Sequence, residues 1–356
     1  MTDAAGAGDD ADTMRGRADE SSWKLWVLLN ADRWVVSLCV LAVLFGSLLA
    51  ISALAPVPLR DVLGQSDPSE TLFQALVTAI ITGVTLVVTI TQLVLSQELG
   101  AVGDQRERME GAMEFRSDVA DVVDAPVSPP EPASFLRALV DATQARAADL
   151  SDAVEGNEEL REQVTSYTTS LDGNADRVRE RLGDAQFGTF EVLYAALDYN
   201  YSWKIYEGRR LQSEYDDSLS EEAREALDGV VETLRLFGPA REHIKTLYFQ
   251  WELTNLSRTV LYAAVPALVV AISGVLFLDA PGTVTGTTLG VDNIVWVVSA
   301  ATTVALAPFV VLLAYVLRIA TIAKRTLAIG PFVLRETERT ETIAWDDAEE
   351  LLYWVL

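Results

Sequence analysis

The chain has 356 residues, half of them hydrophobic, and its mean hydropathy is positive. It is also strongly acidic, with 52 Asp and Glu against 27 Lys and Arg and a net charge of −25. This charge argues against nucleic-acid binding, which needs a basic face. The single cysteine, Cys39, and the single histidine, His243, exclude a disulfide framework and a multi-histidine metal site.

The basic residues are almost all arginine. Lysine stands only at Lys24, Lys204, Lys245 and Lys324. A surface rich in Asp and Glu and poor in Lys is typical of proteins from salt-accumulating archaea, so we expect a haloarchaeal source. The negative charge then serves solubility in concentrated salt and does not indicate a cationic partner.

The first part of the chain is polar. Residues 1–21 are rich in Ala, Gly and Asp without an apolar pattern, and we expect them to be disordered. Residues 22–33 contain tryptophans with a basic residue near each end, which predicts a helix along the inner membrane interface.

Four long apolar runs follow, each close to the ~20 residues that cross a bilayer. They predict spans at residues 34–55, 72–96, 259–279 and 293–318. Residues 97–258 separate the second span from the third, and residues 319–356 form a tail.

The distribution of basic residues around these spans predicts their orientation. The loop before the second span contains one basic residue, Arg60, and the loop at 279–293 contains none, whereas the opposite flanks contain several. By the positive-inside rule, both termini and residues 97–258 are cytoplasmic. We therefore expect a multi-pass protein of the cell membrane.

Residues 97–258 show helical periodicity and no strand alternation. The second span is expected to continue as a helix through residues 104–110, until the proline-rich segment 127–132 breaks it. Sparse apolar residues over 160–182 predict a solvated helix or a coiled-coil arm. A later helix is expected to stop at Gly238-Pro239, and the next runs from residue 240 into the third span.

The predicted fold class is therefore all-α. The protein is expected to be a polytopic membrane protein with four transmembrane helices and a cytoplasmic helical bundle inserted between helices 2 and 3. The aromatic run from Tyr194 to Tyr206 is interpreted as bundle core in preference to a ligand cage.

Catalytic motifs are absent from the sequence. It contains no Walker loop, no Gly-x-Ser-x-Gly and no His-Glu-x-x-His. Pairs such as Glu158-Glu159 fit a solvated acidic surface better than an acid–base or metal site. We expect no enzyme activity, no cofactor, and no catalytic, cofactor-binding or metal-ligating residues.

The second span carries an unbroken polar stripe, which is the most specific feature of the sequence. The stripe consists of Thr71, Gln74, Thr78, Thr82, Thr85, Thr89, Gln92 and Ser96. Their spacings of three and four residues place all eight on one face of a helix. Lipid offers these groups no hydrogen bonds, so the stripe is expected to face protein or water.

Two interpretations of the polar stripe remain open. It is a packing seam, for instance against the small-residue ridge Ala263, Ala267, Ala271 and Gly274 of the third span. Alternatively, it lines a pore in an oligomer, in which case Asp67, one turn beyond, forms a ring of acids at the outer mouth. The order of spans and helical block is similar to that of bestrophin-type anion channels, which favours a channel; no motif matches and no residue is carried over.

The sequence therefore supports two functional hypotheses. The first is an oligomeric passive ion channel lined by the second span. The alternative is a non-catalytic scaffold or sensor in which the polar stripe serves packing and the cytoplasmic bundle binds a protein partner. Both expect the lipid bilayer and other copies of the chain as partners, and neither expects nucleic acid.

Overall fold

The computed structural model describes residues 27, 31–66, 68–98, 100–154, 157–185, 190–278 and 284–325. These residues are almost entirely helical, which confirms the all-α class. The predictions for residues 1–21, for most of 22–33 and for the tail beyond 325 lie outside the described residues.

The chain divides into two compact units. We call residues 23–107 and 247–325 the span unit, and residues 1–22, 108–246 and 326–356 the bundle unit. The 57-residue helix α11 (Glu221–Phe277) contributes its first part to the bundle unit and its last part to the span unit.

The span unit contains helices and one short hairpin. Besides the end of α11, its elements are α3 (Arg33–Leu54), α4 (Leu59–Ser66), α5 (Pro68–Glu98), the strands β1 (Thr287–Thr288) and β2 (Val291–Asp292), and α12 (Asn293–Arg325). The strands pair antiparallel, Thr287 opposite Asp292.

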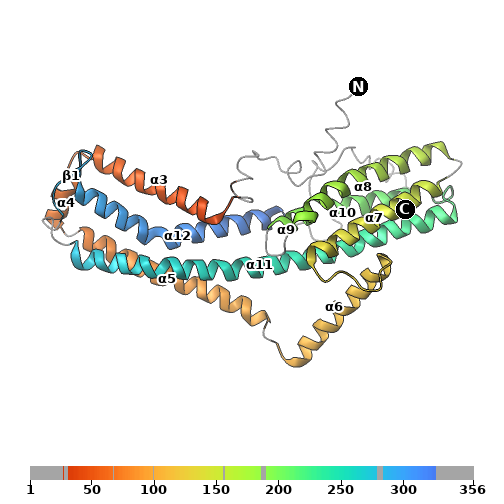
Figure 1. The fold of residues 1–356 in the computed structure, drawn as a ribbon, viewed down its shortest axis with the longest axis horizontal. Helices are drawn as coiled ribbons and strands as arrows, with labels where there is room; N and C mark the ends of the chain where they lie inside the picture. The colour runs from red at the N-terminus through yellow and green to blue at the C-terminus, as the bar shows by residue number, and fades with distance from the viewer. Residues whose placement is uncertain are drawn as a thin grey trace, which may run out of the picture. The chain divides into compact units, whose positions relative to one another are not determined.

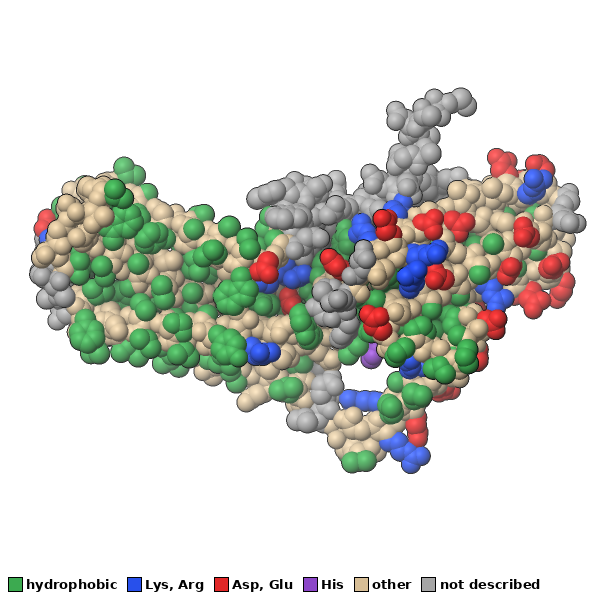
Figure 2. All heavy atoms as spheres, viewed as in Figure 1, with side chains coloured by type: hydrophobic (Ala, Val, Ile, Leu, Met, Phe, Trp, Pro, Cys, Tyr) green, Lys and Arg blue, Asp and Glu red, His purple; other side chains and the backbone are tan. Residues whose placement is uncertain are grey.

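Four helices are long and apolar enough to cross a membrane, which confirms the predicted number of spans. They are α3, α5, α11 and α12. Apolar side chains are spread over the visible surface of these helices, among backbone and uncharged polar atoms, whereas Asp and Glu gather over the helices of the bundle unit (Figure 2). Each unit is thus covered by side chains suited to a different solvent.

The core of the span unit lies between α5, α11 and α12. Phe73 and Ile80 of α5 are buried against Ala267 and Ala271 of α11 and Ala305 of α12. The small alanine side chains allow the helix backbones to approach closely. The first helix, α3, packs on α12 (Figure 1).

The bundle unit is built from the remaining helices. They are the end of α6 (Val102–Val122), α7 (Pro132–Ala153), α8 (Glu158–Asp184), α9 (Phe190–Asp198), α10 (Tyr201–Glu214) and the start of α11. A serine caps the start of α11, because Ser220 Oγ accepts a hydrogen bond from the Ala223 amide at 3.0 Å.

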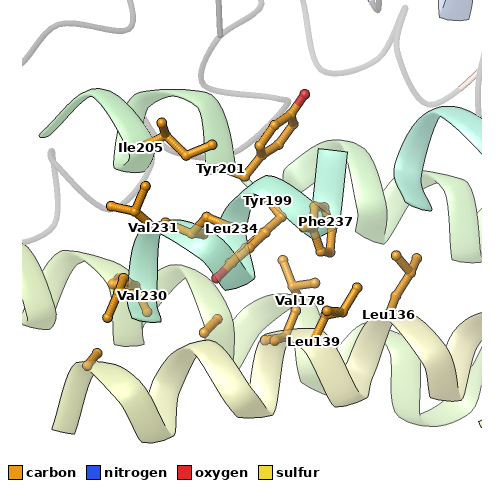
Figure 3. Close-up of a cluster of buried hydrophobic side chains, with 14 of the residues drawn as sticks. Leu136, Leu139, Val178, Tyr199, Tyr201, Ile205, Val230, Val231, Leu234 and Phe237 are labelled. Carbon is orange, nitrogen blue, oxygen red and sulfur yellow. The ribbon is translucent and has the colours of Figure 1, made fainter. Parts of the chain in front are cut away.

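One continuous apolar core holds the bundle together. Leu139 of α7, Val178 of α8, and Leu234 and Phe237 of α11 meet in it (Figure 3). The Tyr199 ring lies edge-on to Phe237, with centroids 4.6 Å apart. The aromatic run is accordingly part of the core, as its interpretation as packing expected.

Three local predictions for residues 97–258 were wrong. The helix of the second span does not continue: α5 ends at Glu98 and α6 begins at Val102, with Gly100 between them. Glycine weakens a helix interior by about 1 kcal/mol relative to alanine, which favours a break there.

Residues 160–182 form neither a solvated helix nor a free arm. They belong to the uninterrupted helix α8, and Leu160, Val164, Leu171 and Val178 are at most 2% exposed. Their spacing gives a narrow apolar seam, which suffices to bury one face of a helix against neighbours.

The predicted end of a helix at Gly238-Pro239 was also wrong, because α11 runs through these residues without ending. The buried side chains of Phe237 and Ala240, on either side of Gly238-Pro239, stabilise the helix at this point.

Candidate functional site

The polar stripe lies on the exposed side of α5. All eight of its residues, Thr71 to Ser96, are exposed in the single chain. The opposite side of the same helix carries the buried residues Phe73, Leu76, Ile80 and Val87. The apolar side chains of α5 therefore hold the helix in the unit, and the stripe points away from the packed core.

The hydroxyl groups of the polar stripe bond to their own helix. Thr82 Oγ1 donates to the Thr78 carbonyl at 2.9 Å, and Thr89 Oγ1 donates to the Thr85 carbonyl at 2.8 Å. Thr78, Thr85 and Ser96 make the same kind of bond at 2.7–3.1 Å. These bonds satisfy the hydroxyl hydrogens without any second helix.

The small-residue ridge of α11 does not contact the polar stripe. Ala267 and Ala271 lie in the apolar core with Phe73, and a Cβ added to Gly274 would lie 2.5 Å from Phe73 Cγ. The ridge thus receives a phenyl ring from the buried side of α5. Gly83 likewise accommodates Phe309 of α12. Within the described residues, the expected seam between the polar stripe and this ridge is therefore not formed.

Among the described residues, the acid at the α4 end of the polar stripe is Glu70, and the acid ring at Asp67 stays a prediction. Asp67 lies outside the described residues. Glu70, one turn before Gln74, is half-buried, and its Oε1 accepts a hydrogen bond of 2.8 Å from Gln74 Nε2. The bond places the Glu70 carboxylate in line with the polar stripe.

Next to this end of α5, an ion pair fastens the loop between α11 and α12. Both carboxylate oxygens of Asp292 accept hydrogen bonds from the Arg60 guanidinium, at 2.6 and 2.7 Å. Arg60 also donates to the Val284 carbonyl, and Asp292 caps α12 through the Ile294 amide. The Arg60 guanidinium holds the pKa of Asp292 below its usual range.

A buried charged cluster at the other end of the spans was missed by sequence reasoning. Arg33 of α3 and Glu252 of α11 are 7% and 3% exposed. Arg318 of α12 pairs with Glu252 at 3.6 Å and lies over the Tyr248 ring. In the sequence, Arg33 and Arg318 flank apolar runs and resemble ordinary basic anchors, and Glu252 resembles one more acid of an acidic chain. Only the fold shows that three helices bring them together.

Hydroxyl pairs extend this polar region between the helices. Thr91 of α5 hydrogen-bonds Ser257 of α11, and Thr259 of α11 lies 3.4 Å from the Tyr315 hydroxyl of α12. Thr91 of α5 thus forms a side-chain hydrogen bond to another helix, and it does not belong to the polar stripe. The contrast separates the packing hydroxyls of α5 from the exposed ones.

The bundle unit contains polar groups that satisfy one another. Lys204 is fully buried, and its ammonium donates to the carbonyl and hydroxyl of Ser170 at 3.1 and 3.2 Å. Burial raises the pKa of the Tyr167 phenol, which stays protonated and donates to the Lys204 carbonyl. His243 is exposed. Among the described residues, no group of three potential metal ligands comes together.

The comparison with protein families gives one match. A model described as a family of unknown function, DUF7972, matches residues 1–347. The chain belongs to this family. The comparisons with curated proteins and with solved structures found no match. Membership therefore assigns no activity, and a function has to be argued from the polar stripe and its surroundings.

Proposed function

We propose that copies of the protein assemble with their polar stripes facing a shared aqueous passage, and that this passage conducts ions passively across the membrane. One observation carries the proposal: the polar stripe of α5 is exposed along its whole length while the opposite side of the same helix is buried. A single chain with four spans does not enclose a passage, so assembly is part of the proposal.

The amides of the polar stripe favour water over lipid. A back-bonded threonine is tolerated against lipid because its hydroxyl hydrogen is satisfied. The side chains of Gln74 and Gln92 each carry two N–H donors and a carbonyl acceptor. An unsatisfied amide in hydrocarbon costs several kcal/mol, about 4–8 on a cyclohexane scale. Gln74 uses one of its donors on Glu70, and the second N–H of Gln74 and the amide of Gln92 still favour an aqueous or protein environment over lipid.

Ion flux from liposomes tests the proposal. With a protonophore present to carry the compensating charge, we expect the purified protein to release a trapped permeant ion, and Thr82→Leu with Thr85→Leu to block the release, because leucine removes two adjacent hydroxyls and narrows the passage. Thr82→Ser with Thr85→Ser retains the hydroxyls and is expected to conduct.

A control pair of variants lies elsewhere on the same helix. Leu86 and Ile90 are 60% and 50% exposed, and neither belongs to the polar stripe. Leu86→Ile with Ile90→Leu is expected to leave the flux unchanged. Absence of flux from the wild-type protein, or a purely monomeric protein in mild detergent, would contradict the proposal.

The scaffold role remains the second candidate, and the surface of α6 favours it. Met109 and Met113 are 62% and 54% exposed on α6, in a stretch rich in charged residues. Flexible methionines suit adaptable protein contacts. A partner captured by the full-length protein should be lost with Met109→Gln and Met113→Gln; a partner retained by this variant speaks against the role of α6.

A further inference from the structure

The polar stripe presents oxygen lone pairs and few donors. A backbone carbonyl only accepts hydrogen bonds, so in each back-bonded hydroxyl the hydrogen points into the helix. This holds for Thr78, Thr82, Thr85, Thr89 and Ser96. The lone pairs of these oxygens are left to face the space beside α5. Gln74 donates one of its two amide N–H groups to Glu70 and keeps the other N–H and its carbonyl oxygen, so the donors that the polar stripe offers come from its two amides and not from the back-bonded hydroxyls.

The charges of α5 have one sign. The helix contains two glutamates, Glu70 and Glu98, and no Lys or Arg. The nearby Arg60 is paired with Asp292 through both carboxylate oxygens, so its charge is compensated within the chain. A passage surrounded by copies of α5 therefore has a negative potential at its Glu70 end.

From these two observations we infer that the passage conducts cations and excludes anions, and that Glu70 is its selectivity-determining residue. The inference rests on the proposed function, because it needs the polar stripe to line water. Oxygen acceptors replace part of the hydration shell of a cation, whereas an anion needs donors. A ring of Glu70 carboxylates, one from each copy, concentrates cations at the entrance.

Glu70 also has a structural role that the experiment must separate from selectivity. It lies in the first turn of α5, where a carboxylate is stabilised by the helix dipole. Glu70→Gln keeps the size of the side chain and removes the charge. Glu70→Asp keeps the charge, and Gln74→Glu adds a carboxylate one turn further along the polar stripe.

The experiment measures the ratio of potassium to chloride permeability in planar bilayers that separate unequal concentrations of potassium chloride. We expect the wild-type ratio to exceed one clearly and to fall roughly tenfold in Glu70→Gln. Glu70→Asp should retain most of the ratio, and Gln74→Glu should raise it. Asp61→Asn removes an exposed acid of α4 outside the polar stripe and should change the ratio little.

The outcomes distinguish the two claims. A wild-type protein that conducts without preference, or prefers chloride, overturns the inference and leaves the ion pathway in place. Cation preference that survives in Glu70→Gln and does not rise in Gln74→Glu overturns the role of Glu70. A wild-type protein that conducts nothing overturns the proposed function itself.

Discussion

The two units treat polar groups in opposite ways. The bundle unit buries its unusual polar residues and pairs them internally, as Lys204 does with Ser170 and Asn174 with the Asp198 carbonyl and the Asn200 amide. The span unit also buries one charged cluster, but it leaves the polar stripe of α5 exposed among apolar surfaces. On a surface of apolar side chains suited to lipid, exposed amides and hydroxyls are exceptions that require an explanation.

This contrast separates stability from function. In the bundle unit, and in the core and charged cluster of the span unit, a substitution is expected to change the free energy of unfolding. On the polar stripe, a substitution is expected to change ion flux and leave the fold intact. Substitutions in these buried regions are therefore expected to lower the free energy of unfolding by amounts that differ from one region to the next.

The largest loss is expected in the bundle core. Phe237 is fully buried and packs on the Tyr199 and Tyr201 rings. Phe237→Ala should lower the unfolding free energy by about 3–5 kcal/mol, because it removes a large apolar group and leaves a cavity. Equilibrium unfolding in mixed micelles measures this loss. Met113→Ala on the exposed face of α6 is the control, and an equal loss there would contradict the assigned core.

The second largest loss of unfolding free energy is expected in the charged cluster of Arg33, Glu252 and Arg318. Glu252→Gln leaves the guanidinium groups of Arg33 and Arg318 without the buried carboxylate, which is expected to cost about 3 kcal/mol. The same change at Glu158, whose side chain is 89% exposed in its pair with Arg161, should cost little. Thermal unfolding in detergent compares the two variants, and similar midpoints would show that the cluster is not structural.

A smaller effect is expected where α5 meets α11. Gly274→Ala places a Cβ against the Phe73 ring and should destabilise the span unit by about 1–3 kcal/mol through overpacking. Gly46→Ala in α3 is the matched control, because nothing lies within 4 Å of the added Cβ. The control is expected to be neutral or mildly stabilising. If both variants behave alike, the close approach of the two helices is wrong.

The smallest effect concerns pH at the loop before α12. The pKa of Asp292 is held below its usual range by Arg60, so the carboxylate stabilises the fold above the pKa of an unfolded aspartate. This stabilisation is lost as the pH falls through the lowered pKa. Hydrogen-exchange protection of the Ile294 amide should decline in that acidic window. Asp292→Asn should show weak protection at every pH, and a persistent pH dependence in that variant would refute the assignment.

The apolar runs were sufficient to predict the four spans, because length and hydropathy alone determine whether a helix crosses a bilayer. The helical periodicity of residues 132–246 also predicted a bundle. Burial of α8 was not predictable from its sparse apolar residues, because burial depends on which neighbours cover its seam. The continuation of α11 through Pro239 was not predictable for the same reason, because packing around Phe237 and Ala240 overrides the tendency of Gly238-Pro239 to end a helix.

The candidate site was predicted in part. Spacing alone placed Thr71 to Ser96 on one helix face, but only the fold shows that Phe73 and Ile80, and not the polar stripe, meet the alanine ridge. The bond between Gln74 and Glu70 depends on rotamers, which periodicity does not specify. The cluster of Arg33, Glu252 and Arg318 joins three helices far apart in sequence, and such contacts follow from packing.

The accessibility of thiols in the bilayer tests directly whether water lines the polar stripe. Cys39 is the single cysteine, so Cys39→Ser provides a background without thiols. Single cysteines at Thr78, Thr82 and Thr85 are compared with cysteines at Leu86 and Ile90. We expect a charged aqueous thiol reagent to modify the first three positions in reconstituted protein and to spare the other two. Equal protection of all five positions would contradict an aqueous passage along the polar stripe.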